Sequence, residues 1–155
     1  MTLNWRSTTR PTLLAAALVL LPALSSAATP PSPVGLWKTI DDKTHTVTGL
    51  VRITETNRQL TGRVERVLDP TAKPGARCKP CTDERRDQPI EGLTILRGVR
   101  ASADEPGVWE GGDILEPKTG KIYRVRLQVQ NGGKSLEVRG YLGFFFRNQY
   151  WQRQE

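Results

Sequence analysis

The sequence is poor in the residues from which catalytic and metal sites are commonly built. It has one histidine, His45, and two cysteines, Cys78 and Cys81, in 155 residues. A structural zinc site needs four protein ligands, so a metal centre is disfavoured. The chain has no G-x-S-x-G elbow, no phosphate-binding loop and no H-E-x-x-H pair. We therefore expect no metal, no cofactor and no catalytic residues, and nothing in the sequence indicates an enzyme.

The chain also lacks an apolar run of the length that spans a bilayer, which is about 20 residues. The apolar run at residues 13–21 follows Arg6 and Arg10 and precedes a stretch of small residues that ends at Ala28. This order is typical of a secretory signal peptide, the alternative being an uncleaved anchor. We interpret residues 1–28 as a signal peptide cleaved near Ala27 or Ala28, and we expect the mature protein to be periplasmic or secreted.

Acidic residues are outnumbered, with 16 Asp and Glu against 23 Lys and Arg and a net charge of +7. Without Arg6 and Arg10, the mature chain keeps 21 basic residues against 16 acidic ones, a net charge of +5. The charges are scattered rather than clustered for a phosphate backbone, and the compartment is wrong for nucleic acid, so we expect no nucleic-acid partner. The positive balance favours either weak attraction to anionic envelope surfaces or simply a well-solvated surface.

Helical periodicity is absent, and period-two alternation takes its place. Within residues 122–129, apolar and polar side chains alternate, as they do in a strand with one buried face. Pro, Gly and Asn turns separate such segments at short intervals. We predict an all-β fold, an antiparallel up-and-down β-barrel with little helix, because closure removes exposed edges; a β-sandwich is the alternative. About eight strands are expected, near residues 36–40, 47–55, 59–68, 93–100, 108–116, 121–130, 134–142 and 147–154.

The mature chain has the length of one domain. Residues 29–34 form a Pro-rich leader, and residues 35–155 are expected to form the barrel. Residues 69–92 lack periodicity, exceed the usual loop length and contain Cys78 and Cys81. In an oxidising compartment such a C-x-x-C can close as a disulfide. We favour a structural staple, with redox exchange and metal binding as alternatives, because no following helix is predicted that would lower a thiol pKa.

The aromatic residues of the mature chain lie in or next to the predicted strands, where they would fill a core or line a ligand cavity. Trp109 and Tyr123, on adjacent predicted strands, are the expected wall residues of such a cavity. Arg139 is the expected partner of an acidic head group. The full set is Trp37, Trp109, Trp151, Tyr123, Tyr141 and Tyr150.

Two short motifs lie at the two ends of the predicted barrel. Gly35-Leu36-Trp37 opens the first strand, and Trp151-Gln152-Arg153 ends the last. This pairing resembles the calycin superfamily, which includes lipocalins and fatty-acid-binding proteins. The resemblance implies that the guanidinium of Arg153 stacks on the indole of Trp37 and closes one end of the barrel.

A longer series of motifs is similar to the DUF2147 family across the whole mature chain. The resemblance implies an exported bacterial protein with a lipocalin-like barrel, and it supplies no catalytic residues. The motifs are GLWKT at 35–39, CxxC at 78–81, PIEGL at 89–93, GDILEPKTGKIY at 112–123, VRGYLG at 138–143 and WxR at 151–153.

Taken together, these features favour a periplasmic binding protein of the lipocalin-like type. Its ligand would be a small apolar or amphipathic molecule, with an acidic head group as one option. The alternative is a non-catalytic structural or stress-related protein of the cell envelope that acts through surface contacts. Space inside the barrel would favour the first hypothesis and a solid core the second. The sequence indicates no oligomeric state.

Overall fold

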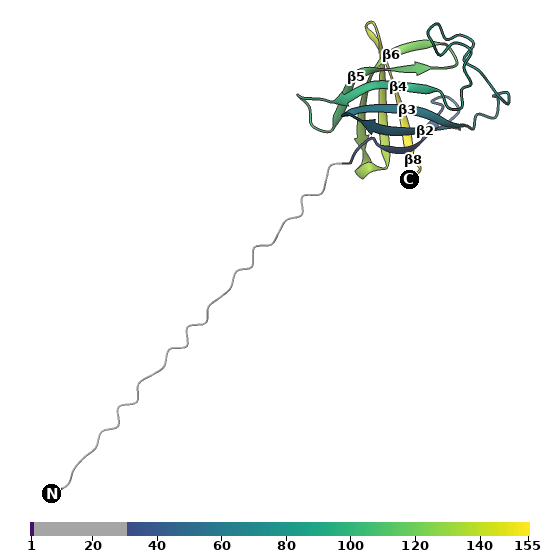
Figure 1. Ribbon diagram of the computed structural model, residues 1–155. Coiled ribbons are helices and arrows are strands. Elements are labelled where there is room, and N and C mark those ends of the chain that lie inside the picture. Colours follow the sequence, from purple (N-terminus) through teal and green to yellow (C-terminus); the bar gives the residue numbers. More distant parts are fainter. Residues whose placement is uncertain (2–30) are drawn as a thin grey trace.

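The computed structural model describes Met1 and residues 31–155. The signal peptide interpreted for residues 1–28, apart from Met1, and its cleavage site near Ala27 or Ala28 lie outside the described residues. The described chain forms eight strands and one short 3-10 turn (Figure 1). In chain order these are β1 (Gly35–Ile40), β2 (Val47–Thr56), β3 (Gln59–Val67), β4 (Thr94–Ala101), β5 (Val108–Glu116), β6 (Lys121–Gln130), η1 (Asn131–Gly133), β7 (Ser135–Leu142) and β8 (Phe145–Arg153).

The strands form one closed antiparallel barrel. Each strand pairs with the next in sequence, and β8 closes onto β1 through the pairs Trp37–Arg153 and Lys38–Gln152. The prediction of an all-β up-and-down barrel is confirmed, and every strand begins and ends within two residues of its expected position. Closure also rules out the sandwich. No helix in the described part of the chain is long and apolar enough to cross a membrane.

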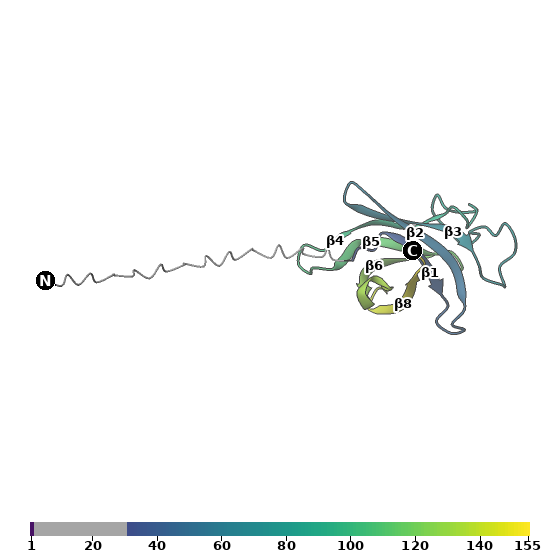
Figure 2. The same ribbon diagram turned by 90° about the horizontal axis from the view of Figure 1, so that it is seen from below.

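The meander gives the barrel two different ends. The open end carries the β1–β2, β3–β4, β5–β6 and β7–β8 connections, and the closed end carries the other three together with the C-terminus (Figure 1). Figure 2 shows the β1–β2 turn and the long β3–β4 loop projecting from the same side of the barrel. The open end therefore holds the longest irregular segment of the barrel.

Apolar side chains fill the closed half of the barrel. They come from the inner faces of six strands, as the period-two pattern predicts, and each is at most 1% exposed. Close packing of such side chains leaves no room for a ligand at this end. The side chains are Trp37, Ile53, Leu60, Val99, Leu127 and Leu136.

Hydrogen bonds and a cation–π contact of Trp37 and Arg153 cover this packed end. The indole Nε1 of Trp37 donates to the carbonyl oxygen of Pro33 at 2.7 Å. The guanidinium of Arg153 lies 4.1 Å from the centre of the Trp37 ring, as the calycin resemblance implies. Arg153 also donates to the carbonyl oxygens of Ser32 and Gly133, at 2.7 and 2.6 Å. It thus joins the last strand, the first strand and the β6–β7 turn, while burial lowers the pKa of its guanidinium.

The β3–β4 loop, residues 68–93, is held against the open end of the barrel. The N–H of Asp69 donates to the carbonyl oxygen of Thr48 at 3.0 Å, which ties the loop to β2. The Asp69 carboxylate pairs with Lys118 of the β5–β6 turn at 2.7 Å. The hydrogen bonds from Lys118 and Thr71 hold the pKa of Asp69 well below its usual range. A backbone hydrogen bond and an ion pair thus fix the loop on β2 and on the β5–β6 turn.

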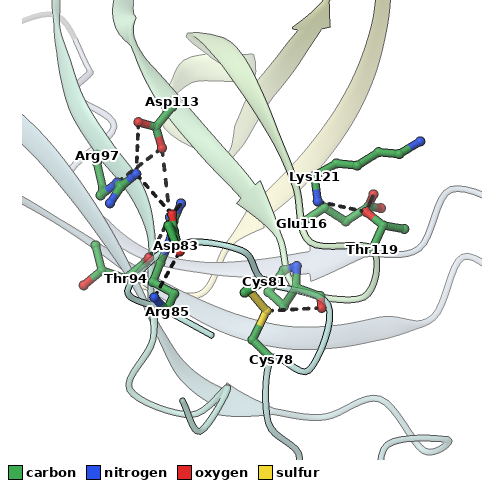
Figure 3. Close-up of a disulfide and its surroundings, with 11 residues drawn as sticks. Cys78, Cys81, Asp83, Arg85, Thr94, Arg97, Asp113, Glu116, Thr119 and Lys121 are labelled. Atoms are coloured by element: carbon green, nitrogen blue, oxygen red, sulfur yellow. Dashed lines mark hydrogen bonds and ion pairs between the residues drawn. A yellow bond between two sulfur atoms is a disulfide. The ribbon is translucent and has the colours of Figure 1, made fainter. Parts of the chain in front are cut away.

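A cluster of charged side chains fastens the far part of the loop to β4 and β5 (Figure 3). Arg85 is the one buried charged residue in the described chain. Its guanidinium pairs with Asp83 at 2.5 Å and donates to the carbonyl oxygen of Thr94 at 3.3 Å. On the strands, Arg97 pairs with Asp113 at 3.3 Å and also reaches Asp83. The hydrogen bond from Arg85 lowers the pKa of Asp83 to about 2.

Cys78 and Cys81 form a disulfide in the middle of this loop. They are 0% and 2% exposed, and the Cys78 sulfur contacts the carbonyl oxygen of Pro117 in the β5–β6 turn (Figure 3). Thiol–disulfide exchange needs an accessible sulfur. Because both cysteines are buried and Cys78 contacts the β5–β6 turn, a structural disulfide is favoured over a redox function.

We expect the variant C78A/C81A to lose about 2 kcal/mol of unfolding free energy, because a four-residue ring constrains the unfolded chain only weakly. Alanine is chosen since it leaves no hydroxyl in the buried site. Urea denaturation of the variant and of the wild type, with and without a reducing agent, measures the change. The reduced wild type should match the variant. An unchanged midpoint would show that the bridge does not staple the fold.

Candidate functional site

A cavity of about 400 Å³ occupies the open half of the barrel. Its volume lies within the range of pockets that hold small molecules. Trp151, 2% exposed, lies between the cavity and the packed half. Aliphatic side chains from several strands and from the β3–β4 loop form most of the wall. They include Val51, Val64, Val67, Ile90, Ile95, Ile114 and Val138.

Two glycines help to leave this space open. Gly49 on β2 and Gly140 on β7 both line the cavity, at inner positions where the closed half carries bulky side chains. A Cβ at position 140 would lie 3.2 Å from the Cβ of Tyr123, so that position has little tolerance for a side chain. The half-filled interior thus follows from which residue types occupy the inner face of each strand.

Few polar groups line the cavity between its floor and its mouth. Gln149 accepts a hydrogen bond from the Trp151 Nε1 at 3.3 Å, and its amide nitrogen has no partner within the described residues. The hydroxyls of Thr39 and Thr48, 2.9 Å apart, bond to each other at the side of the cavity. A ligand would therefore meet a mostly apolar wall with one amide donor, that of Gln149, unengaged.

At the mouth of the cavity lies an arginine that forms ion pairs with two carboxylates. Arg147 lines the cavity and pairs with Asp42 at 2.7 Å and with Glu116 at 3.3 Å. The Tyr123 hydroxyl donates to the other oxygen of Glu116 at 3.3 Å. The hydrogen bond with Asp42 raises the pKa of Arg147. The pKa of Tyr123 is also raised, mainly by burial and to a smaller extent by the negative charge of Glu116. The charge of Arg147 is thus compensated, whereas Arg66, which also lines the cavity, makes no ion pair within the described residues.

Of the three expected ligand residues, the structure places Tyr123 in the cavity wall. Trp109 packs against the core in the closed half, because it pairs with Leu127, far along β6 from Tyr123. Arg139 lies on the outer face of β7, since Val138 and Gly140 on either side of it line the cavity. It is bonded to Asn148 at 2.8 Å and to Glu137 at 2.9 Å. The three residues are not brought together.

The expectation that Tyr141 and Tyr150 fill the interior was also wrong. Both lie on the outer face of the barrel, because their neighbours Gly140 and Trp151 occupy the inner positions. Tyr141 stacks near Phe146 instead, with ring centres 6.3 Å apart, and Tyr150 is 51% exposed. Aromatic content alone does not say which face of a strand a residue occupies.

Sequence reasoning missed Arg147 and Gln149. A signal for both was present, since a buried Trp151 and the period of two place positions 149 and 147 on the same face. No comparable signal marked the loop residues Ala72 and Ala76, which line the cavity from outside the strands. His45 is exposed in the β1–β2 turn. Nowhere in the described chain do three His, Cys, Asp or Glu side chains gather as they would around a metal ion.

Comparisons with known proteins agree with this architecture. The model of the family DUF2147, described as "Uncharacterized protein conserved in bacteria", matches residues 35–153. A solved structure of protein HP1028 from Helicobacter pylori, described as belonging to the lipocalin family, is similar with a TM-score of 0.66. It is 19% identical in sequence, over 81% of this chain and 84% of that chain, a likeness that shows a common fold. No curated protein matches the sequence.

Proposed function

The chain belongs to the DUF2147 family, and from this premise and the form of its barrel we propose that it binds a small apolar or amphipathic molecule in the periplasm. The observation that carries the proposal is the cavity of about 400 Å³ in the open half of the barrel. Trp151 and Val138 give it an apolar floor and wall. Apolar walls with few polar groups are what such ligands need.

The polar groups indicate which head group the ligand carries. Arg147 is paired with two carboxylates, so an acidic head group would have to displace Asp42 or Glu116 to reach it. An uncharged polar group meets no such competition at the unengaged amide of Gln149. We therefore propose a ligand with an apolar body and a small hydrogen-bonding group at Gln149. An acidic head group would be met by Arg66, which lines the cavity without an ion pair in the described residues, rather than by Arg147.

Native mass spectrometry of protein purified gently from its own periplasm would identify a co-purifying molecule. A second measurement uses N-phenyl-1-naphthylamine, a neutral apolar probe whose binding near Trp151 is detected by energy transfer from tryptophan. We expect Val138→Phe to weaken probe binding by at least about tenfold, because the larger ring fills the cavity.

Arg139→Ala is the matched control, since this neighbour of Val138 lies on the outer face and should leave probe affinity unchanged. A native spectrum that shows only the bare protein, together with no probe binding by the wild type, would overturn the proposal. Equal probe affinity of Val138→Phe and wild type would place the binding elsewhere.

A further inference from the structure

The β7–β8 hairpin ends in an apolar tip, residues 142–146, that is largely exposed in the described chain, although Phe146 lies beside Tyr141 and under the guanidinium of Arg139. Phe144 is 104% exposed, Phe145 81%, Phe146 62% and Leu142 46%. Apolar side chains scattered singly over a surface are common, whereas a contiguous apolar patch marks a place of interaction with a protein or a membrane. Phe144 stands at the turn, Phe145 pairs with Leu142 on the inner face, and Phe146 lies on the outer face beside Tyr141. The tip is thus apolar on both faces of the hairpin.

This apolar tip stands at the open end of the barrel, directly beyond the cavity mouth. Gly140 and Arg147 face each other across the hairpin and both line the cavity. Leu142 and Phe145, two residues further along each strand, form the next pair on the same face. The inner wall of the barrel thus continues past the mouth as an apolar surface, on the hairpin that projects from the top of the barrel in Figure 1.

Positive charge lies next to the tip. Lys121 and Arg124 on the neighbouring strand β6 are exposed, and neither makes an ion pair within the described residues. Arg124 stands beside Tyr141 in the register of β6 and β7. Basic residues close to an anionic lipid surface are attracted to it, and the attraction weakens with salt. The net charge of the chain without residues 1–28, with 21 basic residues against 16 acidic ones, is +5 and has the same sign.

We propose that the apolar tip docks into a lipid surface with anionic head groups, which brings the cavity mouth against the membrane. A phenylalanine offers about 150–250 Å² of surface, so the three give about 400–600 Å² at their observed exposure. A stable dimer buries about 800 Å² on each partner. The tip is therefore too small to hold a second copy, whereas a bilayer requires no complementary shape and matches both the apolar rings and the cations beside them.

Flotation with vesicles of phosphatidylethanolamine and phosphatidylglycerol tests this docking, with phosphatidylcholine vesicles as the uncharged comparison. We expect the wild type to bind the anionic vesicles. F144S/F145S/F146S should reduce the bound fraction by at least about tenfold, because it removes three apolar rings whose burial in lipid favours binding. K121Q/R124Q should weaken binding to the anionic vesicles and leave binding to phosphatidylcholine unchanged.

Tyr150→Ser is the matched control, since it removes an exposed aromatic ring from the same hairpin outside the tip and should keep vesicle binding intact. Thermal melting and probe binding without vesicles should be unaltered in the triple variant, which separates docking from the proposed function of the cavity. A wild type that fails to float, or a triple variant that floats equally well, would overturn the inference. So would a dimer in analytical ultracentrifugation that the triple variant abolishes.

Discussion

The variant Trp37→Ala is expected to lose about 3–5 kcal/mol of unfolding free energy, a large share of the stability of an ordinary domain. Trp37 is 0% exposed, so its removal leaves a void in the packed half of the barrel. The indole also supports the guanidinium of Arg153 at 4.1 Å and donates to the Pro33 carbonyl oxygen. All three losses weaken the contact between β1 and β8, the shortest pairing in the barrel.

Urea denaturation followed by far-UV circular dichroism measures this change. Trp109→Ala is the matched control, because that indole is only partly buried at the edge of the same core, and we expect a smaller loss there. Arg153→Met should lose less than Trp37→Ala, since the indole would stay buried under the apolar stem. A loss below about 1 kcal/mol for Trp37→Ala would contradict the view that this residue seals the barrel.

The strands and their closure could be predicted because local chemistry decides them. Alternation in β6 places Val125 and Leu127 inside, and both are buried, at 2% and 0% exposure. The turns contain glycine where the backbone needs positive φ, as at Gly120 (φ 71°) between β5 and β6. Backbone hydrogen bonding then leaves few arrangements for eight such strands other than closure. The period-two alternation and the turn residues were thus sufficient to predict the fold.

The site could be predicted less well, because it depends on where the alternation is interrupted. In β5 the register shifts between Trp109 and Gly112, and Gly111 adopts a φ of 81°. Without that irregularity, Trp109 and Asp113 would share a face; with it, Trp109 turns inward while Asp113 pairs with Arg97. A register shift of one residue moves the following side chains to the opposite face of the strand. No local pattern in the sequence indicates where this shift occurs.

The loop wall of the cavity depends on contacts between residues distant in sequence, and those contacts were beyond sequence reasoning. Asp69 meets Lys118 across 49 positions, and Cys78 contacts Pro117. Such pairs become visible only once the strands have placed the β3–β4 and β5–β6 connections side by side. The sequence showed an unusually long loop with a C-x-x-C, whereas the structure shows that this loop forms part of the site.

The charged anchor of that loop gives the second large effect, since Arg85→Met is expected to lower the unfolding free energy by about 2–3 kcal/mol. Methionine keeps the apolar stem but leaves the Asp83 carboxylate, whose side chain is only 22% exposed, without its main partner. Breaking a buried pair from one side is costly for this reason. Arg52→Met is the matched control, because the Arg52–Glu65 pair is about 40% exposed, and solvent screening should leave its loss with a much smaller effect on stability.

The pH dependence of this difference identifies the interaction responsible. The pKa of Asp83 is lowered from 3.8 to about 2 by Arg85, so the folded protein releases this proton more readily than the unfolded chain. The stability that the pair contributes is therefore complete above pH 3.8 and is lost as the pH falls towards 2. Denaturation midpoints of wild type and Arg85→Met should accordingly converge across this window, while an equal gap at both ends would mean that Arg85 acts through packing alone.

Because Asp83 and Arg85 fasten the loop that carries Ala72 and Ala76 of the cavity wall, the variant should also weaken probe binding at neutral pH.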